Sequence, residues 1–211
     1  MTPTKEEFYK AQCARHGEEL QKKLSETTVA VAGLGGLGSN ISISLARLGI
    51  GKLILIDFDK VDVTNLHRQQ YKACQVGMNK ADALAENLHE INPYIELETH
   101  VEKITSDNAV SLLGGADIVC EAFDNAQNKA MLVETVLTKL DGIYIVSGSG
   151  MAGINSANDI VTKKISEKFF LCGDRTSDVA TSKGLFAPRV MLCASHEALM
   201  VLRIIAGFKE V

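Results

Sequence analysis

The sequence predicts an α/β fold with a doubly wound, mostly parallel sheet that ends in a short strand pair and a closing helix. Three observations predict it. Short apolar runs alternate with helix-like segments, a glycine-rich turn joins the first run to a helix, and acidic residues directly follow two of the runs. In such sheets the carboxyl ends of the parallel strands meet at one edge, where ligands bind. We therefore expect a ligand site at that edge.

The glycine-rich turn follows an apolar run over 29–32. Gly33, Gly35, Gly36 and Gly38 come directly after this run, and a helix with apolar residues near the helical period continues to residue 48. Glycines permit a tight turn and let a phosphate approach the backbone, and the first N–H groups of the helix face the anion. The pattern predicts a Rossmann-like nucleotide site. The alternative is a glycine turn used only for packing.

An acidic residue stands at the end of the next predicted strand. That strand covers 52–56, and Asp57 and Asp59 follow it. A carboxylate roughly 20 residues after the glycine turn can accept hydrogen bonds from both ribose hydroxyls. The same pattern also fits NAD, so the turn and the acid define a ligand class and not a reaction.

The remaining elements continue the alternation. The sequence predicts an amphipathic helix over 4–25, further helices over 79–89, 107–113 and 126–140, and a closing helix over 187–206. Strands are predicted over 95–101, 117–123 and 143–146. A strand pair over 159–165 and 169–172 and a polar loop over 173–184 precede the closing helix. Asp107 is predicted to cap the helix that it begins. We expect residues 1–211 to form a single domain.

Composition is that of an ordinary globular protein, with 46% hydrophobic and 23% charged residues. The net charge of −4 gives no electrostatic reason to expect nucleic acid or an anionic membrane as a partner. The apolar segment over 190–205 contains His196, Glu197 and Arg203, which indicates a buried helix and not a membrane span. The first 25 residues lack the apolar region of a signal peptide, and the five cysteines form no close pairs. These features predict a cytoplasmic protein.

Further motifs point to a known family. They are Asn65-Leu-His-Arg-Gln69, Gly77-Met-Asn-Lys80, Ile91-Asn-Pro93 and Asp124-Asn125. With the glycine turn and Asp57-Phe-Asp59, they resemble the ThiF/MoeB family of adenylyltransferases. That family activates ubiquitin-like sulfur carrier proteins and shares a fold with ubiquitin-activating enzymes. The resemblance is strong from about residue 8 to 150 and weaker beyond.

The resemblance implies a reaction that uses ATP and Mg²⁺. In that family the C-terminal glycine carboxylate of the carrier attacks the α-phosphate of ATP, which gives an acyl-adenylate and pyrophosphate. Because this carboxylate is already ionised at neutral pH, catalysis needs positioning and fixed cations and no general base.

The resemblance also implies a role for each matching residue. Arg68 and Lys80 supply cations to the phosphates, and Asp124 holds Mg²⁺. Asp57 holds the ribose, while Asn65 and Gln69 contact phosphate or orient the loop. The full nucleotide-binding set is Gly33, Gly35, Gly36, Gly38, Asp57, Asp59, Asn65, Gln69 and Asn125. The structural alternatives are solvated cations at Arg68 and Lys80, a helix cap at Asp124 and a turn at Asn65.

Two further candidates rest on features outside these motifs. The family places an arginine ahead of the glycine strand that reaches the neighbouring subunit's site, and Arg15 is the candidate here, although its neighbours differ from the usual motif. This implies a homodimer. Some members link a cysteine to the carrier through sulfur, and Cys172 is the best-placed candidate, whereas Cys193 is expected in the core. The two Cys-x-x-Cys pairs that bind zinc in many members do not occur, so no zinc is expected.

The sequence therefore favours a homodimeric adenylyltransferase for a ThiS-like sulfur carrier with a C-terminal Gly-Gly, serving thiamine biosynthesis. Three alternatives stay open. They are ATP-dependent modification of a tRNA adenosine on the same fold, a nicotinamide-dependent oxidoreductase, and a non-catalytic nucleotide-binding partner protein.

Overall fold

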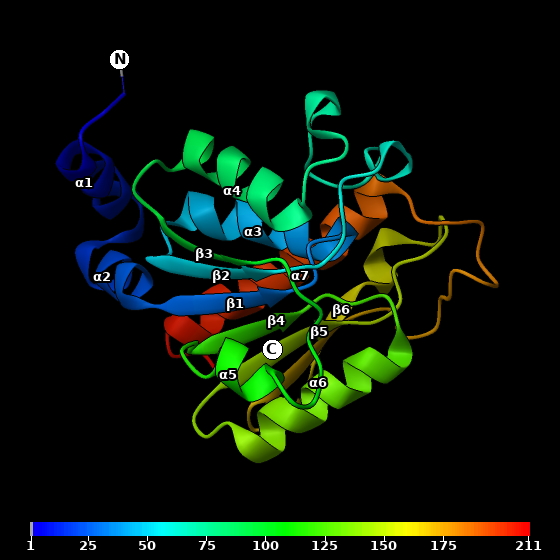
Figure 1. The fold of residues 1–211 in the computed structure, drawn as a ribbon. Coiled ribbons are helices and arrows are strands. Elements are labelled where there is room, and N and C mark those ends of the chain that lie inside the picture. The colour runs from blue at the N-terminus through cyan, green and yellow to red at the C-terminus, as the bar shows by residue number, and fades with distance from the viewer. Residues whose placement is uncertain (1) are drawn as a thin grey trace.

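A seven-stranded sheet forms the centre of the molecule in the computed structural model, which describes residues 2–211 (Figure 1). The strand order is β3-β2-β1-β4-β5-β7-β6. All neighbouring strands are parallel except β6 and β7, which are antiparallel. The strands are β1 (Thr28–Ala32), β2 (Lys52–Ile56), β3 (Glu96–His100), β4 (Ile118–Glu121), β5 (Tyr144–Gly148), β6 (Val161–Ser166) and β7 (Phe169–Gly173). The predicted fold class, including the C-terminal strand pair, is confirmed.

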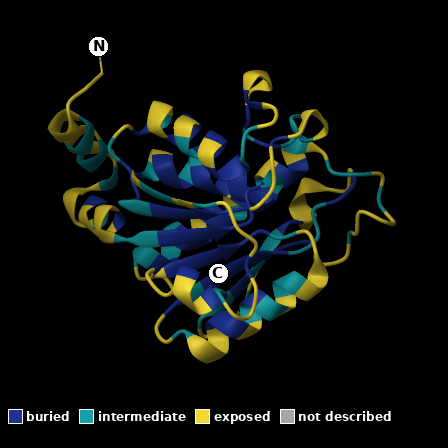
Figure 2. Ribbon diagram, in the orientation of Figure 1, coloured by how far each residue is buried: buried dark blue, intermediate teal, exposed yellow. Residues whose placement is uncertain are grey.

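Helices cover both faces of the sheet and leave its inner strands β1, β2, β4 and β5 mostly buried, whereas the edge strands β3 and β6 are partly exposed (Figures 1 and 2). One face carries α3 (Gly36–Leu48), α4 (Lys80–Ile91) and the closing helix α7 (Ala187–Ile205), and α3 packs along α7. The other face carries α5 (Ala109–Leu113) and α6 (Ala126–Lys139) over a second apolar cluster. Strands buried on both faces explain why the sequence shows continuous apolar runs at 53–56 and 118–120.

The N-terminal segment differs from the prediction of one helix over 4–25. It forms two helices, α1 (Lys5–His16) and α2 (Glu18–Glu26). Gly17 separates them with φ 84°, a left-handed backbone conformation that favours glycine. No residue of α1 is buried, whereas α2 buries Gln21 and Leu24, so only the second helix packs on the core.

Two predicted helix caps are also wrong by one residue. The helix α5 begins at Ala109 and has Asn108, not Asp107, at its N-cap position. The helix α6 is capped by Asn125, whose Oδ1 accepts hydrogen bonds from the backbone N–H groups of Gln127 and Asn128 at 3.0 Å each. The alternative of Asp124 as the cap of α6 is therefore wrong.

The connections after β1 and β4 leave the sheet on opposite faces. The chain passes from β1 to α3 on one face and from β4 to α6 on the other, although β1 and β4 are neighbours. Such a reversal opens a crevice at the carboxyl ends of the strands. Within residues 2–211, no helix is both long enough and apolar enough to cross a membrane.

Candidate nucleotide-binding site

A cleft of about 520 Å³ lies at the carboxyl ends of the central strands. Its lining comes from the glycine turn, the segment after β2, the β4–α6 turn, the end of β5 and the loop after β7. A larger hollow, of about 650 Å³, lies at the opposite edge, next to the starts of β1, β4 and β5. That hollow contains none of the predicted site residues, so the chemistry points to the smaller cleft.

The glycine turn forms one wall of the cleft, and the backbone itself requires glycine there. Gly33 has φ 89°, and a Cβ at this position would lie 3.0 Å from the carbonyl oxygen of Ala122. A Cβ at Gly38 would lie 1.8 Å from the carbonyl oxygen of Gly33. The first N–H groups of any α-helix have no partner within the helix. In α3 these groups belong to Gly36, Leu37 and Gly38, and the first two of these residues line the cleft. This wall is suited to an anion.

The acids after β2 and Lys80 form a charged cluster in which Lys80 and Asp57 are buried and Asp59 is half exposed. Lys80 Nζ lies 2.8 Å from Asp59 Oδ2 and 3.9 Å from Asp57 Oδ2, and Lys80 is only 5% exposed. A solvated surface cation at Lys80 is thereby excluded. Burial raises the pKa of Asp57, while Lys80 and two backbone N–H groups oppose that rise. The cluster holds a fixed cation at the cleft.

The two acids differ in how their oxygens are used. Asp57 Oδ2 accepts a hydrogen bond from the Leu34 N–H at 2.6 Å, and its Oδ1 accepts one from the Asp59 N–H at 2.8 Å. Asp57 therefore ties the glycine turn to the end of β2, and a ribose would have to share its oxygens. The Asp59 side chain is half exposed and pairs with Lys80 through one oxygen. Asp59 is thus the more available ribose acceptor of the two.

The segment 65–69 brings polar atoms to the same cleft. Arg68 Nε and Gln69 Oε1 are buried, and neither has a hydrogen-bond partner among the residues that the structure describes. Buried polar atoms without partners are rare in folded proteins and indicate a missing ligand or water. Asn65 also lines the cleft, and its carbonyl oxygen accepts hydrogen bonds from the N–H groups of Arg68 and Gln69 at 3.1 Å.

Asp124 lines the cleft from the turn between β4 and α6. Its side chain is exposed, and no hydrogen bond or ion pair involves its carboxylate within residues 2–211. The described part of the chain contains no group of three or more His, Cys, Asp or Glu residues that would hold a metal by itself. One carboxylate that shares a cation with phosphate oxygens is the arrangement that Mg²⁺ commonly adopts. Asp124 fits that requirement.

Lys129 is a cleft residue that the sequence motifs did not indicate. It extends from α6 to Glu121 at the end of β4, with N–O distances of 3.0 and 2.8 Å. Glu121 is fully buried and also accepts a hydrogen bond from the Ser147 hydroxyl. The eight-residue separation between Glu121 and Lys129 spans a strand end, a turn and a helix start, so no periodic pattern could have revealed the pair.

Four candidates are absent from the cleft lining, and one of them, Gly38, is buried in the first turn of α3. Arg15 is exposed on α1, and α1 lies beyond the edge where the strands begin (Figure 1), at the opposite end of the sheet from the cleft. Asn125 caps α6 and is absent from the cleft lining. Cys172 is fully buried, and burial raises the pKa of its thiol far above the usual range. A reactive thiol at Cys172 is therefore contradicted, because sulfur chemistry needs an accessible thiolate. Cys193 lies in the core, as expected.

The comparison with protein families identifies the class to which this fold and cleft belong. Residues 9–211 match the ThiF family. The chain therefore belongs to the ThiF family, which confirms the resemblance drawn from the motifs.

Curated relatives and solved structures agree with this assignment. "Adenylyltransferase and sulfurtransferase MOCS3" of Aedes aegypti is 41% identical over 137 residues, which cover 64% of this chain and 31% of that protein. The protein of the same name from Dictyostelium discoideum is 30% identical over 203 residues, which cover 90% of this chain and 45% of that protein. The chain thus spans less than half the length of these relatives.

Among solved structures, E. coli tRNA N6-threonylcarbamoyladenosine dehydratase, TcdA, in complex with ATP matches with a TM-score of 0.85. The match covers 98% of both chains at 22% identity. E. coli MccB with AMPCPP and MccA matches with a TM-score of 0.70 at 24% identity, over 90% of this chain and 59% of that chain. At these identities, the likeness establishes the fold.

Proposed function

We propose that the protein is an ATP-dependent adenylyltransferase that activates the C-terminal carboxylate of a ubiquitin-like sulfur carrier protein. The observation that carries this proposal is the convergence of Arg68, Lys80 and Asp124 on one cleft, beside the amino end of α3. A cleft that combines two cations, backbone N–H groups and one uncommitted carboxylate suits a triphosphate with a divalent cation.

In the proposed reaction, a carboxylate oxygen of the carrier forms a bond to the α-phosphorus of ATP. The bond from this phosphorus to the α,β-bridging oxygen breaks, and pyrophosphate leaves with the bonding electron pair. Arg68 and Lys80 stabilise the negative charge that develops on the phosphate oxygens. Asp124 would hold Mg²⁺, which neutralises part of that charge when bound. The glycine turn holds the triphosphate in place, and Asp59 together with Asp57 binds the ribose.

The finer proposal is a ThiS-like carrier with a Gly-Gly tail, thiamine biosynthesis and a homodimer. The motifs of the ThiF/MoeB family support the carrier, and residues 1–211 contain no Cys-x-x-Cys pair, which favours a ThiS-like carrier over the molybdopterin carrier. The position of Arg15, far from the cleft of its own chain, leaves the partner's cleft as the place where it would act. Two named relatives are adenylyltransferases, and MccB has been crystallised with MccA.

Carrier-dependent exchange of label between pyrophosphate and ATP tests the proposal. We expect exchange with a purified ThiS-like protein that ends in Gly-Gly and none when the same protein lacks its two terminal glycines. The Asp124→Asn variant, which keeps the side-chain shape, should lose most of the exchange. Absence of exchange with any Gly-Gly-tailed carrier would refute the proposal.

A second candidate is ATP-dependent modification of a tRNA adenosine. The observation that favours it is the match to TcdA, a tRNA-modifying enzyme by name, with a TM-score of 0.85. ATP consumption stimulated by tRNA, with no effect of a Gly-Gly carrier, would support this candidate. For the oxidoreductase alternative, fluorescence titration with ATP and NADH provides the separation, and we expect ATP alone to bind.

A further inference from the structure

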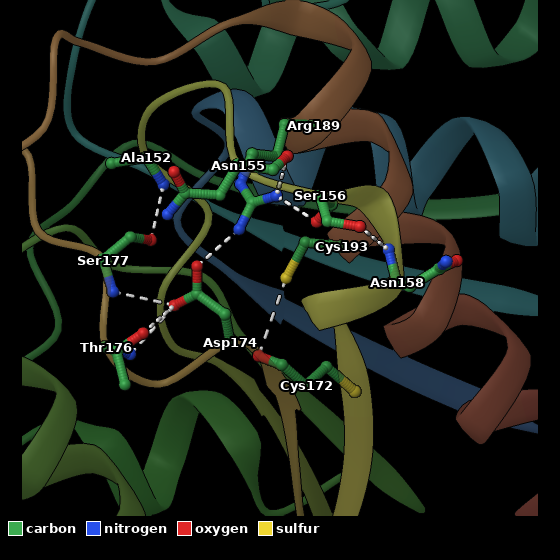
Figure 3. Close-up of polar contacts among 10 residues, drawn as sticks. All are labelled: Ala152, Asn155, Ser156, Asn158, Cys172, Asp174, Thr176, Ser177, Arg189 and Cys193. Carbon is green, nitrogen blue, oxygen red and sulfur yellow. Dashed lines mark hydrogen bonds and ion pairs between the residues drawn. The ribbon is translucent and has the colours of Figure 1, made fainter.

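A buried ion pair lies beside the cleft, outside the nucleotide-binding residues. Arg189, in the first turn of α7, pairs with Asp174, which directly follows β7 (Figure 3). The two side chains are 6% and 4% exposed. Arg189 Nη1 also donates to the carbonyl oxygens of Asn155 and Ser156 at 2.7 and 2.6 Å. Neither Asp174 nor Arg189 lines the cleft.

Asp174 connects two loops, 148–152 and 173–179, that both contribute residues to the cleft lining. Its Oδ1 accepts hydrogen bonds from the N–H groups of Thr176 and Ser177 at 2.9 and 2.8 Å, and the Ser177 hydroxyl accepts one from the Ala152 N–H at 3.0 Å (Figure 3). The Asp174 N–H donates to the Gly150 carbonyl at 2.9 Å. Loops 148–152 and 173–179 are therefore fixed to each other and, through Arg189, to α7.

These contacts lower the pKa of Asp174. Burial alone would raise it, but the backbone N–H groups of Ser177 and Thr176, the Ser177 hydroxyl and Arg189 outweigh burial. The carboxylate thus stays ionised and continues to accept these hydrogen bonds at neutral pH.

The cleft-lining residues of loops 148–152 and 173–179 differ in chemistry from the glycine turn and the charged residues on the nucleotide side. These lining residues are Gly148, Ser149, Gly150, Met151, Ala152, Ser177, Asp178 and Val179. They include no cation, and the one charged side chain is acidic, so they do not suit a phosphate. A wall made mostly of small residues leaves room for an extended, uncharged chain of small residues. A tail that ends in Gly-Gly has that chemistry.

We propose that Asp174 and Arg189 are a positioning pair for the acceptor side of the cleft. They hold loops 148–152 and 173–179 as one wall, against which the small-residue tail of the carrier lies, and they leave the nucleotide side unaffected. This inference rests on the proposed function for the identity of the acceptor. The fixing of the two loops is independent of it.

Steady-state kinetics with Asp174→Asn test the acceptor role. The asparagine keeps the shape and its Oδ1 acceptor but loses the ion pair. In Asp174→Asn we expect the KM for a ThiS-like Gly-Gly carrier to rise at least tenfold and the KM for ATP to change less than twofold. At the other end of the pair, Arg189→Lys should keep a lower KM for the carrier than Arg189→Met. Lys164→Met, which removes the Lys164–Glu210 ion pair on β6, is the matched control and should change neither KM. A rise in both KM values, or in neither, would overturn the proposal.

Amide hydrogen exchange tests the same pair without any carrier. In Asp174→Asn we expect the amides of Ala152, Thr176 and Ser177 to exchange at least tenfold faster, while the amides of β1 and α3 keep their wild-type rates. Unchanged exchange in the two loops would overturn the positioning role even if the carrier reaction fails in the wild-type protein. Failure of the wild-type reaction with faster loop exchange in the variant would refute only the proposed function.

Discussion

The two sides of the cleft are built in different ways. Most of the nucleotide side comes from one stretch of chain, 33–80, which contains the glycine turn, Asp57, Asp59, Arg68 and Lys80, and the β4–α6 turn adds Asp124. The acceptor side comes from residues 148–152 and 177–179, which are held together by Asp174 and by Arg189 on the closing helix. The first side is local and depends on fixed charges. The second is assembled by a buried ion pair between distant segments, so damage to each side should have a different signature.

The largest expected effect is on the nucleotide side. Lys80→Met removes a buried cation, and we expect kcat/KM for ATP in the carrier reaction to fall about 10²- to 10³-fold, as for loss of a donor that stabilises transition-state charge. Steady-state kinetics with varied ATP at saturating carrier measure this ratio. The control is Lys72→Met, which breaks an exposed ion pair to Glu90 outside the cleft lining. A loss below fivefold for Lys80→Met would mean that this cation does not act on the phosphates.

The glycine turn provides the next effect, on stability. Gly38→Ala places a Cβ where the carbonyl oxygen of Gly33 lies, and we expect the free energy of unfolding to fall by about 1–3 kcal/mol, the range for overpacked sites. Gly115→Ala is the matched control, because a Cβ there meets nothing within 4 Å. Urea unfolding of both variants measures their free energies of unfolding. Equal stability of the two would show that the turn adjusts easily and is not held as described.

A buried acid under the acceptor side predicts a pH effect on stability. Glu197 is fully buried against Gly148, and neither oxygen has a hydrogen-bond partner in the described part of the chain. Burial raises its pKa well above 4.5, while Lys129 opposes and Glu121 adds to the rise; its carboxyl also faces the thiols of Cys120, Cys172 and Cys193. When the pKa of an acid is higher in the folded than in the unfolded state, the protein loses stability as the pH rises above the pKa of that acid in the unfolded state.

Glu197→Gln removes this titration and keeps the shape. We therefore expect the variant to gain more in Tm, relative to the wild type, at pH 8 than at pH 5. The difference should be a few degrees, since about 1 kcal/mol corresponds to about 2–4 °C in a chain of this size. Thermal unfolding at the two pH values measures it. The same Tm difference at both pH values would show that the pKa of Glu197 is not raised in the folded protein.

The smallest expected effect is at His67, which lies beside Arg68 and the loop after β7. His67 Nε2 lies 3.2 Å from the Leu185 carbonyl oxygen and 3.3 Å from Arg68 Nη1, and it makes one of these hydrogen bonds at a time: it donates to the carbonyl when it carries the proton and accepts from Arg68 when it does not. His67→Ala should lower kcat about threefold to tenfold, the equivalent of one modest hydrogen bond. His67→Gln, which can still hydrogen bond, should lose less. Equal losses in both variants would contradict this role.

The same contrast explains how much the sequence could predict. The glycine turn and Asp57 were predictable from their spacing and Lys80 from the family resemblance, and all three positions lie at the cleft. The alternation of apolar runs and helix-like segments predicted the mostly parallel sheet and a C-terminal strand pair, but not that this pair is antiparallel. The break at Gly17 was missed because helix-forming residues flank it on both sides, and only the left-handed backbone conformation at Gly17 ends α1.

The acceptor side could not be predicted in the same way. Asp174 and Arg189 are fifteen residues apart and lie on either side of a polar loop, so no local pattern connects them. Cys172 was a candidate because it precedes that loop, yet in β7 its thiol is buried in the core. Successive residues of a strand point to opposite faces of the sheet, and Cys172 points to the face that α7 covers.

A crystal structure with a non-hydrolysable ATP analogue and Mg²⁺ tests the central claim most directly. The account predicts a triphosphate on the amino end of α3, with Arg68 and Lys80 within hydrogen-bond distance of its oxygens, Mg²⁺ at Asp124, and the α-phosphorus open toward loops 148–152 and 173–179. A nucleotide bound in the larger hollow at the opposite edge of the sheet, or one in the cleft with Arg68 and Lys80 turned away from its phosphates, would contradict it.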